Sequence, residues 1–114
     1  MEIPEAVRFI FEGMRLMKGG EIFVLKMKER FIVDFAKAAI AKYGNSKKTM
    51  LSFIGMRPGE KLREALLTTE EMSHTLETKS MFIIHPYTSA MVDALGPYQY
   101  PGAKKARNNK YVAH

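Results

Sequence analysis

The spacing of apolar residues changes twice between residues 21 and 54, and this change restricts the fold more than any other feature. Residues 21–26 (EIFVLK) are β-branched and aromatic, which is typical of a short strand. Residues 31–43 repeat apolar side chains at helical spacing, and residues 49–54 (TMLSFI) are again typical of a strand. A strand, a helix and a strand within about 30 residues predict a βαβ unit, which is normally right-handed with parallel strands.

Further helices and strands are expected on both sides of this unit. Apolar residues recur every three or four positions over residues 4–18, and the Gly19-Gly20 pair ends that helix. Pro58 suits the first turn of another helix, and the segment TTEEM indicates a cap with a short helical turn at 68–72. We therefore expect a small α/β fold with strands at about 21–26, 49–54 and 80–85, and helices at about 4–18, 31–43 and 58–67.

Length and composition limit the domain organisation. A chain of 114 residues accommodates one small domain, and the composition changes after Leu95 to Gly, Pro, Tyr, Asn and Lys. We expect a domain over residues 1–95 and a basic, flexible tail over residues 96–114. No apolar run is long enough to span a membrane, and Glu2 and Glu5 stand where a signal peptide would be basic. The absence of cysteine excludes a disulfide framework or a thiolate nucleophile, and a cytoplasmic location fits best.

The net charge of +6 raises the alternative of a small basic nucleic-acid-binding domain. Four of the bases (Lys104, Lys105, Arg107 and Lys110) lie after Leu95 in a stretch without acids, so the rest of the chain carries only +2. Because a short basic tail is more often a solvated end than a binding surface, nucleic acid is the less favoured partner.

The residues with the clearest chemical potential lie in the segment GMRPGEK, at 55–61. If a helix begins at Pro58, the first-turn amides of Gly59, Glu60 and Lys61 have no helical partner and face an anion favourably. The Arg57 guanidinium can hold a phosphate through two bonds, and the Glu60 carboxylate can accept hydrogen bonds from a ribose. The alternative is a simple turn with solvated charges, and the residues by themselves leave both interpretations open.

Several blocks resemble a known family. In order and spacing, the chain is similar to consecutive C-terminal blocks of capsular-polysaccharide biosynthesis proteins of the extended short-chain dehydrogenase/reductase class. These are chiefly UDP-N-acetylglucosamine 4,6-dehydratases and related 4-epimerases. The similar segments are MEIPEAVRFIFEG (1–13), GGEIFVLKM (19–27), VDFAKAAI (33–40), GMRPGEKLREALLTTEE (55–71) and HTLETKSMFIIHP (74–86). The chain departs from the family at Arg63 and after Pro86.

The resemblance implies a substrate-binding role without catalysis. In such enzymes a Rossmann half binds NAD or NADP and supplies the catalytic Tyr and Lys, while the other part binds the UDP-sugar. Carried over to this chain, Arg57 would contact the diphosphate and Glu60 the ribose, with Gly59 and Lys61 beside them. Tyr43 and Lys47 have the Tyr-to-Lys spacing only across a turn. The expected partners are the UDP-sugar, a separate Rossmann domain or subunit, and a second copy of the chain.

Other candidates are assigned to structure. His74 and His85 are eleven residues apart without a carboxylate in register, so we expect no metal site. Phenylalanines and methionines are expected to fill the core: Phe9, Phe11, Phe23, Phe53, Met14, Met17, Met27 and Met56.

Overall fold

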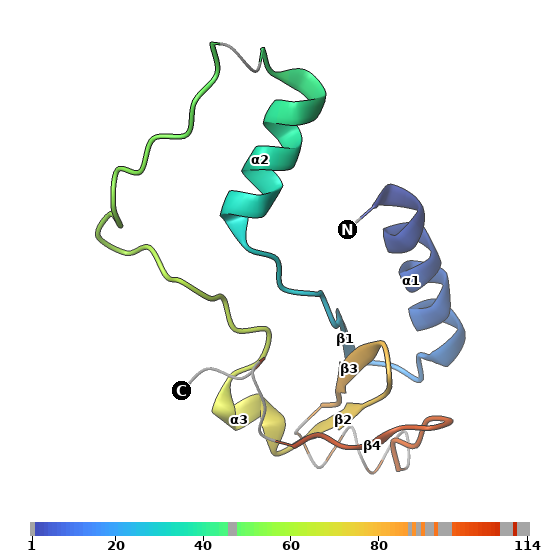
Figure 1. The fold of residues 1–114 in the computed structure, drawn as a ribbon. Coiled ribbons are helices and arrows are strands. Elements are labelled where there is room, and N and C mark those ends of the chain that lie inside the picture. The colour runs from blue at the N-terminus through green and yellow to red at the C-terminus, as the bar shows by residue number, and fades with distance from the viewer. Residues whose placement is uncertain are drawn as a thin grey trace. The chain divides into compact units, whose positions relative to one another are not determined.

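The computed structural model describes residues 2–45, 48–86, 88, 90, 93, 97–107 and 111 (Figure 1). The chain divides into two compact units, one formed by residues 1–27 with 63–114 and the other by residues 28–62. The helices are α1 (Ile3–Leu16), α2 (Ile32–Tyr43) and α3 (Thr69–Met72). The strands are β1 (Ile22–Leu25), β2 (Thr75–Glu77), β3 (Met81–Ile84) and β4 (Lys104–Lys105).

The first unit contains a four-stranded sheet in the order β1-β3-β2-β4, and all three pairings are antiparallel. β3 occupies the centre, with Phe23 opposite Ile83 on one side and Leu76 opposite the same residue on the other. Its four residues are all buried. A strand covered on both faces must be apolar at every position, which explains the uninterrupted run MFII.

Successive residues of β3 point to opposite faces of the sheet and therefore enter two different clusters. Met81 and Ile83 pack with Tyr98, Tyr100 and the α1 residues Phe9 and Leu16. Phe82 and Ile84 pack on the other face with Leu67 and Ala106. The core of this unit is thus organised around β3.

The capped turn before β2 is confirmed. Thr68 Oγ1 accepts a hydrogen bond from the Glu71 amide at 3.2 Å, and Glu71 Oε2 accepts one from the Thr68 amide at 2.8 Å. This reciprocal capping box satisfies two amides that the short α3 helix leaves without helical partners. It fixes the point where the chain enters the sheet.

The general prediction of a small α/β fold is confirmed, as are the helices near 4–18 and 31–43 and the strands near 21–26 and 80–85. The predicted βαβ unit is wrong. β1 pairs with β3 in the antiparallel sense, and residues 49–54 form no strand. A strand requires a neighbour for its backbone groups, and Met50, Phe53 and Ile54 lie 89%, 79% and 74% exposed.

The helix predicted over residues 58–67 is also absent from the structure. Gly59 adopts φ +86°, which a right-handed helix does not allow. The apolar residue meant for the inner face, Leu62, is 88% exposed, so no packing stabilises a short helix here. The strand and the helix fail for the same reason, because neither has an apolar surface to pack against.

The prediction of a flexible tail is wrong for residues 97–107 and 111. Tyr98, Tyr100 and Ala106 are buried, and β4 pairs with β2. The Tyr111 carbonyl accepts hydrogen bonds from the amides of Leu66 and Leu67. This segment belongs to the first unit, so the boundary predicted at residue 95 is not observed. The other residues of the predicted tail, Lys110 among them, lie outside the described residues.

The core prediction is correct for only part of the set. Phe9 and Phe23 pack against the buried cluster around β3. The other six residues are exposed on the surface: Phe11, Phe53, Met14, Met17, Met27 and Met56. Within the described part of the chain, no helix combines the length and apolar character needed to cross a membrane.

Candidate functional site

The segment with the predicted site residues forms a turn in the second unit. The Arg57 amide donates a hydrogen bond to Glu60 Oε2 at 2.7 Å, and the Glu60 amide donates to the Arg57 carbonyl at 3.1 Å. Gly59 lies between them in the left-handed region, at φ +86°. The structure therefore brings Arg57, Gly59 and Glu60 together through local bonds alone.

The charged groups of this turn face solvent. Arg57, Glu60 and Lys61 are exposed, and within the described residues no hydrogen bond or ion pair holds the Arg57 guanidinium or the Lys61 ammonium. No atom lies within 4 Å of the position that a Cβ on Gly59 would occupy. An anion can thus approach the backbone at Gly59 while two cations stand on either side of it.

Two parts of the sequence-based argument are not realised. The turn does not start a helix, so no helix dipole adds to the attraction of an anion. One oxygen of the Glu60 carboxylate accepts a hydrogen bond from its own turn, which reduces its capacity to accept bonds from a ribose. The remaining chemistry is that of a small cationic turn with an accessible backbone.

A second polar region lies in the first unit and was not predicted. A hollow of about 530 Å³ is lined by Glu77, Lys104, Lys105, Ala106 and Arg107. Sequence analysis counted these bases as tail charges because nothing in the spacing indicated that β4 pairs with β2. The only signal was the run KKAR itself, since the pairing joins residues far apart in the chain.

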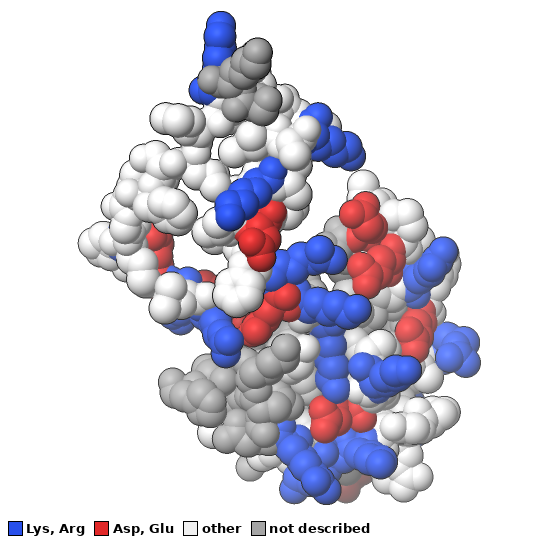
Figure 2. Space-filling view, in the orientation of Figure 1, with Lys and Arg blue, Asp and Glu red and all other residues white. Residues whose placement is uncertain are grey.

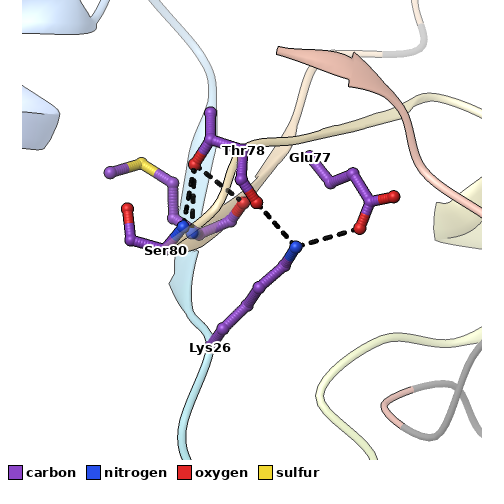
Figure 3. A network of polar contacts seen from close by, with 5 residues as sticks. Lys26, Glu77, Thr78 and Ser80 are labelled. Atoms are coloured by element: carbon purple, nitrogen blue, oxygen red, sulfur yellow. Dashed lines mark hydrogen bonds and ion pairs between the residues drawn. The ribbon is translucent and has the colours of Figure 1, made fainter. Parts of the chain in front are cut away.

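A network of polar contacts holds the β2–β3 turn beside this hollow (Figure 3). Lys26 Nζ lies 2.9 Å from Glu77 Oε2 and donates to the Thr78 carbonyl at 2.6 Å. The same ammonium lies 4.5 Å from the centre of the Phe82 ring. Because the charge of Glu77 is already paired with Lys26, the other charged groups that line the hollow are all basic.

The two histidines lie close together. The rings of His74 and His85 are 5.8 Å apart, and the ring of His85 stacks on that of Tyr98 at 5.5 Å. Among the described residues no group of three or more His, Cys, Asp or Glu side chains could hold a metal ion. Their ring contacts give the histidines a packing role.

Glu21 is the most heavily bonded carboxylate in the described first unit. Its oxygens accept hydrogen bonds from Tyr100 Oη at 2.6 Å, the Lys18 amide at 2.6 Å and the Gly19 amide at 2.7 Å. Burial by itself raises the pKa of Glu21, but these bonds outweigh it and hold the pKa below its usual value. Burial and the bond to Glu21 both raise the pKa of Tyr100. This cluster fixes the corner between α1 and β1 and is structural.

Comparison with known proteins identifies the family. The sequence profile of the family described as "Polysaccharide biosynthesis protein" matches residues 1–86, so the chain belongs to that family. It is 46% identical over 74 residues to the capsular polysaccharide biosynthesis protein CapD of Staphylococcus aureus, a match that covers 63% of this chain and 12% of the relative. Against the inverting UDP-N-acetylglucosamine 4,6-dehydratase of Campylobacter jejuni, identity is 29% over 86 residues, covering 75% of this chain and 24% of the relative.

Two further comparisons concern an archaeal protein and a solved structure. An uncharacterized membrane protein of Methanocaldococcus jannaschii is 41% identical over 92 residues, which cover 76% of this chain and 28% of the relative. The X-ray structure of Pen from Bacillus thuringiensis superposes with a TM-score of 0.71 and 32% identity, covering 97% of this chain and 32% of Pen. The chain thus spans less than a third of each of these relatives. The matches confirm the family, but they do not confirm that the chain corresponds to its C-terminal part.

Proposed function

We propose that this chain is the UDP-sugar-binding portion of a nucleotide-sugar 4,6-dehydratase or 4-epimerase of polysaccharide biosynthesis, and that it is not catalytic by itself. The observation that carries the proposal is the exposed turn at residues 57–61, in which two cations flank an accessible backbone. A diphosphate needs this combination of planar and point-like cationic donors beside bare amides.

The individual residues have distinct roles in this proposal. Arg57 binds one phosphate group through its guanidinium fork, and Lys61 balances the charge of the other. Gly59 leaves room for the phosphate oxygens to reach the backbone. Glu60 shapes the turn through its bond to the Arg57 amide, and its second oxygen is the acceptor for a ribose hydroxyl. The name of the Campylobacter relative, which specifies a UDP-sugar, supports this class of ligand.

The cofactor and the reacting groups belong to another part of the enzyme in this proposal. The described residues offer no dinucleotide site, since Gly19-Gly20 follows α1 and precedes β1, the reverse of the order that such a site requires. NAD or NADP would therefore be bound by a separate Rossmann domain or subunit. A cytoplasmic location, expected from the cysteine-free sequence, is part of the same proposal.

The test is a titration of the isotope-labelled chain with UDP, followed by NMR, with pyrophosphate and uridine as controls. We expect weak binding, at about millimolar UDP, because the chain supplies only part of the pocket. Amide shifts should centre on residues 57–61 and should be larger with UDP than with either control. No turnover of a UDP-sugar is expected.

Two variants make the titration decisive. Arg57→Ala should abolish the shifts, whereas Arg30→Ala, which removes an exposed arginine elsewhere in the same unit, should leave them unchanged. The proposal is wrong for this chain if UDP causes no shift at millimolar concentration, or if both variants respond like the parent sequence.

The basic hollow beside β4 supports a second candidate, a nucleic-acid-binding function. Figure 2 counts against it, because on the face drawn the Lys and Arg groups are interspersed with Asp and Glu. Binding of this kind would weaken steeply with salt and would be reduced by Lys104→Ala with Lys105→Ala. Salt-dependent RNA or DNA binding without any response to UDP would favour this second function.

A further inference from the structure

The helix α1 has apolar residues on two sides, and only one of these sides is covered. On the inner side Phe9 and Leu16 pack against the buried cluster that contains Met81 and Ile83. Gly13 is buried, and the Phe23 ring lies 3.5 Å from the position of a Cβ there. These contacts are enough to attach α1 to the sheet.

A second apolar stripe faces away from that contact. Its residues follow the alternating four- and three-residue spacing that keeps side chains on one side of a helix. All of them are between 45% and 80% exposed: Ile3, Val7, Ile10, Phe11, Met14 and Met17. We call this set the outer stripe.

The width of the apolar surface distinguishes α1 from an ordinary surface helix. At about 100° per residue, the inner side and the outer stripe together span roughly 220° of the helix circumference. A helix that covers one core typically has an apolar arc of about 100°. The charged residues that follow Pro4 in the helix, Glu5, Arg8, Glu12 and Arg15, occupy the remaining side. Such a helix is built to lie between two apolar layers.

We propose that the outer stripe of α1 packs against an apolar protein surface in the part of the family's fold that this chain does not contain. The proposal rests on the proposed function, since it names the surface through which the substrate-binding portion joins the cofactor-binding part. Its support is the comparison with Pen, in which 97% of this chain, at a TM-score of 0.71, accounts for only 32% of the solved chain. The same fold therefore exists within a protein about three times longer.

The charges near the stripe argue against a lipid surface as its occupant. Helices that bind anionic membranes carry an excess of Lys and Arg on their polar side. In α1 that side holds two acids, Glu5 and Glu12, and two bases, Arg8 and Arg15, which balance. A protein surface requires no such excess.

The absence of cysteine from the sequence allows a direct test by thiol labelling. Ile10→Cys introduces a thiol into the outer stripe, and Arg8→Cys introduces one on the charged side as the matched control. Each is labelled in the isolated chain and in a chimera in which this chain replaces the superposed third of Pen. In the isolated chain both thiols should react at similar rates, because both positions are exposed.

In the chimera the Ile10→Cys thiol should react about tenfold more slowly or less, because a covered thiol reacts only when the interface opens. The Arg8→Cys thiol should be unchanged. If the chimera does not fold, the same two substitutions at the superposed positions of a cysteine-free Pen give the same comparison. Equal rates at both positions in the folded chimera, or in Pen, would overturn the proposal.

Other occupants produce different results, and each would also overturn it. Protection of the Ile10→Cys thiol that grows with the concentration of the isolated chain identifies a second copy. Protection at all concentrations means that the chain covers the stripe itself. Protection only by vesicles of phosphatidylglycerol identifies a lipid surface. UDP is left out of every arm, so failure of the UDP titration and failure of this test remain distinct.

Discussion

Tyr100 Oη donates a hydrogen bond of 2.6 Å to Glu21 Oε1 across 79 residues of sequence. Tyr98 makes a similar connection, donating to the Gly19 carbonyl at 2.9 Å. The two tyrosines therefore attach the C-terminal segment to the corner between α1 and β1. Several predictions about stability depend on this connection and on the Lys26 network.

Tyr100→Phe should lower the free energy of unfolding by about 1.5–3 kcal/mol, because it removes a hydrogen bond to a charged carboxylate while keeping the ring in place. Urea unfolding followed by circular dichroism measures the change. Tyr43→Phe is the control, since Tyr43 is 79% exposed and should change stability very little. Equal effects of the two substitutions would contradict the structural role of the Tyr100 hydroxyl.

The lowered pKa of Glu21 predicts that the chain loses stability in acid. A carboxyl whose pKa is lower in the folded state takes up protons more readily when unfolded, so acidification favours unfolding. The contribution is fully present above the unfolded pKa of about 4.3 and disappears as the pH falls through the folded value. Urea midpoints of the parent chain and Glu21→Gln should differ at pH 7 and converge in acid; a constant difference would contradict this account.

The pair Lys26 and Glu77 should contribute modestly. The two side chains are 16% and 25% exposed, so a double-mutant cycle of Lys26→Met and Glu77→Gln should give a coupling energy of about 0.5–1 kcal/mol. Lys26→Met alone should cost about 1–2 kcal/mol, because it also leaves the Thr78 carbonyl without its donor. A coupling energy of zero would mean that the contact of 2.9 Å does not persist in solution.

Truncation after residue 96 should abolish cooperative unfolding. It removes the buried Tyr98, Tyr100 and Ala106 together with β4, and it uncovers Met81 and Ile83. Each large buried side chain contributes about 1.5–3 kcal/mol, whereas a whole domain is stable by about 5–15 kcal/mol. A truncated chain that unfolds at the same urea concentration as the parent would restore the interpretation of this segment as a flexible tail.

The candidate site illustrates the limit of sequence reasoning. The sequence named Arg57, Gly59 and Glu60 as one cluster, and the structure places them in one turn because the bonds between them are local. The roles of these residues, and that of Lys61, stay predictions. The strand at 49–54 and the helix at 58–67 were wrong, since periodicity reports that a segment can bury one face but not that a partner for this face exists.

The sequence by itself determined the features that depend on neighbouring residues. These are α1, α2, β1 and β3, the Thr68 capping box and the family to which the chain belongs. Only the tertiary structure decided that β3 is central and antiparallel to β1, and that residues 97–107 pack onto the sheet. Hydrogen bonds between strands and burial of tyrosines join residues far apart in the chain, and hydrophobic attraction has no direction that local spacing could encode.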